Sequence, residues 1–83
     1  MPRFILHHAG AYNEWTTVAD GPCWESALTL GQLEQVAETL PDRLIRAHAT
    51  GCSGVGWSLA DCAEIAEMTL PDFINKYLTL PHA

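Results

Sequence analysis

The tetrapeptide Thr-Leu-Pro-Asp occurs twice, at residues 39–42 and 69–72, and it constrains the fold more than any other feature of the chain. Each copy follows a segment that begins like a helix: residues 29–38 (TLGQLEQVAE) align without a gap on residues 58–67 (SLADCAEIAE). Both segments open with a hydroxyl residue followed three positions later by Gln or Asp, which is the pattern of a capping box. The order capped helix, Thr-Leu-Pro-Asp, second helix is therefore predicted twice.

The tetrapeptide itself has the chemistry of a helix start. Threonine can act as the N-cap residue. Proline fits the first turn, because the N–H group that it lacks would have no partner there, and aspartate complements the positive end of the helix dipole. Pro41 and Pro71 also push Leu40 and Leu70 away from helical angles, which predicts a bend between two short helices at each site. Gly51 suits the end of the helix that follows the first copy. A true repeat and independent use of good capping chemistry both explain the pattern, and two copies are fewer than a solenoid needs.

The N-terminal part has strand character instead. Residues 3–8 alternate so that Phe4 and Leu6 share one face with His8, while Ile5 and His7 share the other. Ala9-Gly10 is a turn signal, residues 12–19 (YNEWTTVA) indicate a second strand, and Asp20-Gly21-Pro22 should end it. We expect one α+β domain over residues 1–83, in which an N-terminal antiparallel β-hairpin (3–19) packs on a bundle of about four short helices (29–78).

The charge balance indicates what kind of partner the chain can bind. The sequence contains ten acidic and four basic residues, which gives a net charge of −6 and a pI near 4.9. Such a surface repels phosphate backbones and attracts basic proteins, so we expect a basic protein or nucleoprotein partner and no direct nucleic-acid binding. No apolar run is long enough to span a membrane, and the N-terminal segment is too short for a signal peptide, so the expected location is the cytoplasm.

The residues with reactive side chains give little sign of catalysis. Three cysteines cannot all pair within one chain, so we expect reduced thiols. Metal-binding spacings such as Cys-x-x-Cys are absent, and adjacent His7 and His8 on a strand face opposite ways, so neither His48 nor a cysteine completes a metal site with both. Cys52, next to Ser53 in the Gly-rich loop, lacks an identifiable base, and a thiol enzyme built on it is the weakest alternative. The expectation is a non-enzyme without cofactor or metal.

The C-terminal half also has the outline of a helix-turn-helix. In that interpretation Cys62-Ala63, Phe73, Ile74 and Tyr77 are packing positions. Glu67 departs from the pattern, because a glycine is usual at that point of the turn. The second helix would present Asn75 and Lys76 to DNA, and a transcriptional regulator or antitoxin component is therefore the main alternative function.

The stretches YNEWTTVADGP, ALTLGQLEQV and RAHATGCS resemble small proteins encoded by phages and prophages. Some small acidic phage proteins are anti-CRISPRs, which mimic nucleic acid in charge and block the basic surfaces of CRISPR surveillance complexes. The resemblance implies an inhibitor of this kind and carries over no individual binding residue. That the cytoplasm is that of a bacterial host cell is implied only by this resemblance.

We therefore expect a non-enzymatic acidic interaction module that inhibits a basic, nucleic-acid-handling complex. Acidic residues that face away from the apolar helix stripes are the best candidates for binding. Tryptophans beside turn signals are candidate interface anchors, although core filling explains them equally well. A homodimer through the hairpin edge is left open. The candidate partner-binding residues are Glu34, Glu38, Glu64, Glu67, Trp24 and Trp57.

Overall fold

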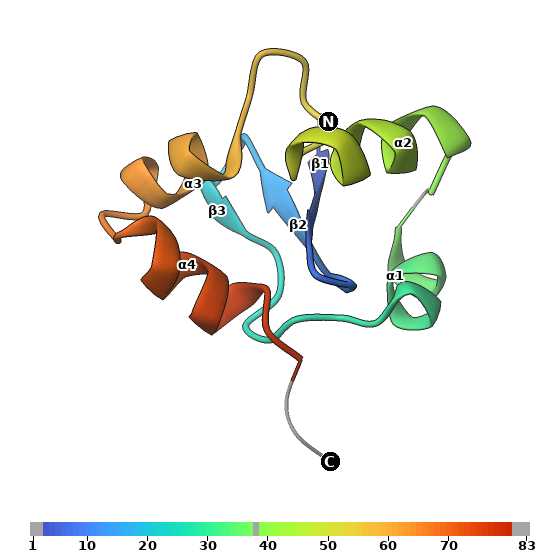
Figure 1. Ribbon diagram of the computed structural model, residues 1–83, viewed down its shortest axis with the longest axis horizontal. Helices are drawn as coiled ribbons and strands as arrows, with labels where there is room; N and C mark the ends of the chain where they lie inside the picture. The colour runs from blue at the N-terminus through green and yellow to red at the C-terminus, as the bar shows by residue number, and fades with distance from the viewer. Residues whose placement is uncertain (1–2, 38, 81–83) are drawn as a thin grey trace.

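A three-stranded antiparallel sheet lies between two pairs of helices in the computed structural model, which describes residues 3–37 and 39–80 (Figure 1). The predicted α+β class, the N-terminal hairpin and the four helices are confirmed. The strands are β1 (Arg3–His8), β2 (Ala11–Thr16) and β3 (Gly21–Pro22), and the helices are α1 (Leu30–Val36), α2 (Pro41–Thr50), α3 (Leu59–Ile65) and α4 (Leu70–Tyr77).

The hairpin turns at Ala9 and Gly10, as the sequence predicts. Both residues have positive φ, 48° and 82°, which is the requirement of the type I′ turn that joins two strands tightly. The register pairs Ile5 with Glu14 and Leu6 with Asn13. Paired residues point to the same side of the sheet, so this register decides which side chains meet each layer of helices.

The second strand ends at Thr16, earlier than expected, and Gly21–Pro22, expected only to end that strand, forms a third strand. The chain turns over residues 17–20, and Gly21–Pro22 then returns as β3 against Thr16 and Trp15. Proline is tolerated there because β3 is an edge strand, where the missing N–H removes no ladder hydrogen bond.

Both free edges of the hairpin are covered by segments of the same chain. On the β1 side, His7 N–H donates to the Gly51 carbonyl and Ser53 N–H donates to the Ile5 carbonyl, each over 2.9 Å. On the β2 side, Tyr12 and Leu28 exchange both backbone hydrogen bonds, at 2.9 and 2.7 Å. Backbone groups that would otherwise recruit another strand are satisfied internally at these positions.

The sheet separates two apolar cores, so the four helices do not form a single bundle. One core joins Ile5 and Tyr12 to α1 and α2, chiefly through Leu33 and Ala47. The larger core joins the opposite face to α3 and α4 and includes Leu6, Trp15, Cys52, Cys62, Ala63, Phe73 and Leu78. Figure 1 shows α1 and α2 on one side of the hairpin and α3 and α4 on the other.

The two predicted capping boxes are present. The Thr29 hydroxyl accepts from Gln32 N–H while the Gln32 side chain accepts from Thr29 N–H, and Ser58 and Asp61 make the same reciprocal pair. These local contacts fix where α1 and α3 begin, as good capping chemistry should.

The two Thr-Leu-Pro-Asp copies start their helices differently, contrary to the prediction. Thr69 caps α4 and accepts from Asp72 N–H, and Leu70 is already helical. In the first copy Leu40 is the N-cap, with ψ 142° and no side-chain cap hydrogen bond. The restriction that proline places on the preceding residue therefore holds at Leu40 and not at Leu70, where the helix begins one residue earlier.

The helices also pair differently on the two sides of the sheet. α3 packs against α4, whereas α2 packs on β1 and α1 packs on β2. The predicted bent pair is thus formed by α3 and α4, and α1 and α2 are two separate supports of the hairpin. In the part of the chain that the structure describes, no helix has the length and apolar character needed to cross a bilayer.

Candidate functional site

Three acidic side chains follow one another at helical spacing along α3 and the turn after it: Asp61, Glu64 and Glu67. Asp61 and Glu64 lie within α3, where residues three apart are neighbours on the helix surface and like charges repel one another. Glu67 follows in the turn after the helix, and its N–H donates to the Glu64 carbonyl over 3.1 Å. Glu64 and Glu67 are exposed and Asp61 is half-buried. The sequence has no Lys or Arg between residues 47 and 75, so no basic side chain of this segment compensates them. We call these three residues the α3 acidic stripe.

Two further features make the stripe unfavourable for the isolated fold. Glu64 and Glu67 lie at the C-terminal end of α3, where the helix dipole is negative and acidic groups are destabilising. Glu67 also has φ 59°, a left-handed conformation that disfavours side chains other than glycine. Charge and backbone therefore both oppose glutamate at this end of α3.

Trp57 lies beside the stripe, immediately before the Ser58 cap of α3. Its ring is half-buried and packs at a tilt against Phe4, with 5.8 Å between ring centroids. It lines a cavity of about 480 Å³ between the loop 51–57 and the neighbouring ends of α2 and α3. Val55 and Asp61 also line this cavity, and Val55 is 90% exposed. An aromatic ring, an exposed apolar side chain and a carboxylate thus meet at one opening.

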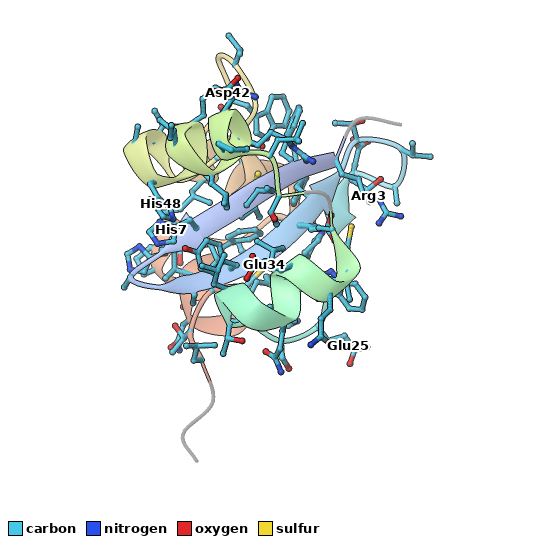
Figure 2. All side chains as sticks on the ribbon, turned by 90° about the vertical axis from the view of Figure 1, so that its right-hand side faces the viewer. Arg3, His7, Glu25, Glu34, Asp42 and His48 are labelled. Atoms are coloured by element: carbon cyan, nitrogen blue, oxygen red, sulfur yellow. The ribbon has the colours of Figure 1, made fainter. Side chains whose placement is uncertain are left out.

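Glu34 and Trp24, two other candidate residues, belong to the opposite side of the sheet. Glu34 is exposed on α1 and is labelled there in Figure 2. The Trp24 indole N–H donates over 3.1 Å to Glu14, the cross-strand partner of Ile5 on the α1–α2 side. Trp57, Glu64 and Glu67 therefore belong to the α3–α4 side of the sheet, whereas Glu34 and Trp24 belong to the other side. Trp57 precedes the start of α3 and shares the cavity with Asp61, while the two glutamates lie at the C-terminal end of the helix. Glu38 lies outside the described residues.

The basic side chains are largely held by the protein itself. Arg43 donates to the Arg3 carbonyl, and Arg46 donates to the Ser53 carbonyl over 2.9 Å. The Lys76 ammonium lies 5.2 Å from the centroid of the Tyr77 ring. Both arginines belong to α2 and fasten it to neighbouring backbone, and Arg46 also lines the cavity beside Trp57 and Asp61.

His7, Tyr12 and His48 form a polar aromatic cluster that the sequence did not predict. The Tyr12 hydroxyl lies 2.7 Å from His48 Nε2, and the His7 and His48 rings are 4.3 Å apart between centroids (Figure 2). Burial lowers the pKa of His7, and the nearby His48 and His8 lower it further. The cluster joins α2 to the hairpin.

The described residues contain no group of three or more His, Cys, Asp or Glu side chains placed to hold a metal ion. His7 and His48 come together, but the adjacent His8 is exposed on the other face of β1. His48 is hydrogen-bonded to Tyr12 and His7 to the Gly10 backbone, and these bonds engage one ring nitrogen of each histidine.

Two of the three cysteines meet in the larger core. Cys52 and Cys62 are buried free thiols of one core cluster and interact with each other, whereas Cys23 is a half-buried free thiol beside β3. This interaction lowers the pKa of Cys52 and raises that of Cys62, while burial raises the pKa of Cys23. Nothing in the spacing of Cys52 and Cys62 along the chain indicates this interaction.

The α3–α4 unit has several features of a helix-turn-helix. Ala63, Cys62 and Phe73 are buried at the contact between the two helices, as that interpretation predicts. Glu67 occupies the position of the usual turn glycine and adopts the positive φ that such a glycine would have. Asn75 and Lys76 are exposed on α4, together with Asp72.

Comparison of the chain with protein-family models, curated proteins and solved structures finds no match.

Proposed function

We propose that the protein is a non-enzymatic acidic interaction module that inhibits a basic, nucleic-acid-handling protein complex. The observation that carries the proposal is the α3 acidic stripe: exposed glutamates lie at the end of a helix where both the dipole and their mutual repulsion oppose them. A cationic partner surface would remove both costs. The binding energy would then come partly from relief of repulsion within the free protein.

The chemistry of the stripe suggests which partners fit. Proteins that hold nucleic-acid backbones present lysine and arginine side chains to phosphate groups. The same side chains would pair with the exposed carboxylates of Glu64 and Glu67, while Asp61 also accepts from Ser58 in the capping box. A CRISPR surveillance complex, the target implied by the resemblance to phage proteins, is one such partner. If this protein occupied the partner's basic surface, the nucleic acid could not bind there. Inhibition would then need no catalysis.

Trp57 and the cavity beside it supply the apolar part of the interface. Buried aromatic anchors surrounded by polar residues dominate the energetics of many protein interfaces. Trp57 is half-buried, adjoins Asp61 and has the highly exposed Val55 across the same opening. A partner side chain with an apolar stem and a cationic head would fit this combination of ring and carboxylate.

One experiment separates this surface from the rest of the acidic protein. A tagged chain is used to capture proteins from a nuclease-treated bacterial lysate, in wild-type form and as Glu64→Lys and Glu34→Lys. Both variants reverse one charge on an exposed helix position, but on opposite sides of the sheet. We expect a basic complex to be retained by the wild type and Glu34→Lys and lost with Glu64→Lys. Equal retention by all three chains would contradict the proposal.

A DNA-binding regulator is the second candidate, favoured by the turn geometry at Glu67 and by the packing of Ala63 and Phe73. In this case α4 would present Asn75 and Lys76 to base edges or phosphates. The two functions respond to Glu64→Lys in opposite directions. Removal of negative charge weakens the binding of a basic protein and strengthens the binding of DNA. Recovery of a defined DNA fragment at physiological salt, lost in Asn75→Ala, would favour the regulator.

A further inference from the structure

Each of the two buried thiols of the α3–α4 core accepts a hydrogen bond from an N–H group. The Trp57 indole N–H donates to Cys62 Sγ over 3.1 Å, and Gly54 N–H donates to Cys52 Sγ over 3.4 Å. Both sulfurs belong to the same buried cluster, and the interaction of the two thiols lowers the pKa of Cys52 and raises that of Cys62. The N–H donor on the Cys52 sulfur also favours its thiolate over the thiol.

The pair adjoins the cavity that Trp57 lines. Cys52 itself is among the residues around this cavity of about 480 Å³, with Gly54, Val55 and Gly56 forming its loop wall. Cys52 is only 1% exposed, and a cavity next to such a sulfur admits a small reagent more easily than a bulky one. The site is thus selective by size.

The third cysteine lacks all of these features. Cys23 is half-buried beside β3, and its thiol has Glu14 nearby, which together with burial raises its pKa. Its greater exposure would make it the faster thiol if access alone decided reactivity. Cys23 is therefore an internal reference for whether the environment of Cys52 matters.

We propose that Cys52 and Cys62 form a peroxide-reactive site, in which Cys52 is the attacking thiol and Cys62 is the resolving thiol. The Cys52 thiolate attacks one oxygen of hydrogen peroxide, the O–O bond breaks, and the other oxygen leaves as hydroxide and is protonated to water. The resulting Cys52 sulfenic acid is attacked by Cys62 sulfur. The S–O bond breaks, and the hydroxyl leaves as water with the proton of Cys62. Two thiols and one peroxide give one disulfide and two waters.

The disulfide would act on the same opening as the proposed partner site. Cys52 belongs to the segment that covers the β1 edge, and Cys62 belongs to α3. A bond between them ties the loop 51–57 to α3 and removes the thiol whose sulfur accepts from the Trp57 indole. Trp57 fluorescence should therefore report the reaction. The chemistry needs only this chain and peroxide, so its outcome is independent of whether a partner binds.

The test uses the native chain with about one equivalent of hydrogen peroxide, followed by alkylation of the remaining thiols and peptide mass spectrometry. We expect a cross-linked peptide pair containing Cys52 and Cys62, lighter by two hydrogen atoms, while Cys23 is recovered alkylated. Cys52 should oxidise severalfold faster than Cys23, because its hydrogen-bond donor favours the thiolate, whereas burial and Glu14 raise the pKa of Cys23. Equal rates, or oxidation of Cys52 without the cross-link, would overturn the proposal.

Variants separate the roles of the two thiols. Cys62→Ser should leave a Cys52 sulfenic acid that dimedone traps, whereas the matched control Cys23→Ser should form the cross-link like the wild type. Failure of dimedone to label folded Cys62→Ser would contradict the assignment of Cys52 as the attacking thiol. If circular dichroism shows that Cys62→Ser does not fold, the comparison of Cys52 with Cys23 in the native chain decides the question alone.

Discussion

The side-chain amide of Asn13 donates a hydrogen bond to the backbone carbonyl of Tyr77 over 3.0 Å, and this contact joins β2 to the C-terminal end of α4. The same amide donates to the Trp24 carbonyl over 3.0 Å, and its oxygen accepts from the N–H groups of Glu14 and Trp24. Asn13 is fully buried. One side chain therefore connects the central strand, the segment along its edge and the last helix.

Asn13→Ala should be among the most destabilising single substitutions in the chain. It leaves buried carbonyl and N–H groups without this partner, and each such group costs about 1–3 kcal/mol. We expect a loss of about 3 kcal/mol or more in the free energy of unfolding, measured by urea denaturation. Asn75→Ala on the exposed side of α4 is the matched control and should change it by less than about 0.5 kcal/mol. Similar losses for both variants would show that the Asn13 hydrogen bonds contribute little.

Glu67→Gly should stabilise the isolated protein. Glycine removes the steric cost of φ 59° and the carboxylate at the negative end of α3. We expect a gain of about 1 kcal/mol in the free energy of unfolding. Glu64→Gly removes the same charge from within α3 and should instead cost roughly 0.5–1 kcal/mol, partly offset by the dipole. If thermal denaturation shows Glu67→Gly to be the less stable of the two, the backbone at this turn is not under strain.

The His7 cluster should make stability depend on pH in a defined direction. Burial lowers the pKa of His7 below its ordinary value of 6.5, and the nearby His48 and His8 add to the effect. The unfolded chain therefore binds this proton first as the pH falls. The contribution of His7 to the free energy of unfolding should be fully present above pH 6.5. It should decrease as the pH falls from 6.5 to the lowered pKa of His7 in the folded protein, and below that pKa it should no longer change.

Two measurements check this pH dependence. An NMR titration should place the midpoint of His7 below that of a model peptide and move it upward in His48→Gln, more than in His8→Gln, because His48 contributes the larger electrostatic effect. In His7→Gln, the decrease in urea midpoint just below pH 6.5 should become smaller. An unchanged decrease would assign the pH dependence to other groups.

Local chemistry explains which elements could be predicted from the sequence. The turn at Ala9-Gly10 and the capping boxes at Thr29 and Ser58 are formed within a few residues, so their sequence patterns determine them directly. The first Thr-Leu-Pro-Asp copy failed as a threonine cap because its surroundings differ. The segment before α2 is extended at Ala37 and Leu40, whereas the segment before α4 turns tightly at Glu67.

The parts that were not predicted depend on contacts between distant residues. The pairing of Ser53 with Ile5, the meeting of Cys52 with Cys62 and the hydrogen bonds of Asn13 have no periodic signal. The alternation of Phe4 and Leu6 with Ile5 and His7 was visible, but it did not show that helices cover both faces. Two apolar faces on a short hairpin could have indicated this, since a strand that is hydrophobic on both sides needs two layers.

For the same reason, only part of the proposed site could be predicted from the sequence. Exposure of Glu34, Glu64 and Glu67 followed from helical spacing, because each lies off its apolar stripe. Helical spacing did not predict that these residues lie on two different sides of the sheet, because that depends on which face of the sheet each helix covers. Trp24 and Trp57 are both near turns, yet one is bound to Glu14 and the other to Cys62.

Competition for the captured basic complex tests the central claim most directly. The immobilised wild-type chain is loaded from nuclease-treated lysate, and free wild-type, Glu64→Lys and Glu34→Lys proteins are titrated as competitors at physiological salt. We predict that Glu34→Lys competes like the wild type, while Glu64→Lys needs at least about tenfold more protein, which corresponds to roughly 1.4 kcal/mol of binding energy. Equal competition by all three proteins would contradict the assignment of partner binding to the α3 acidic stripe.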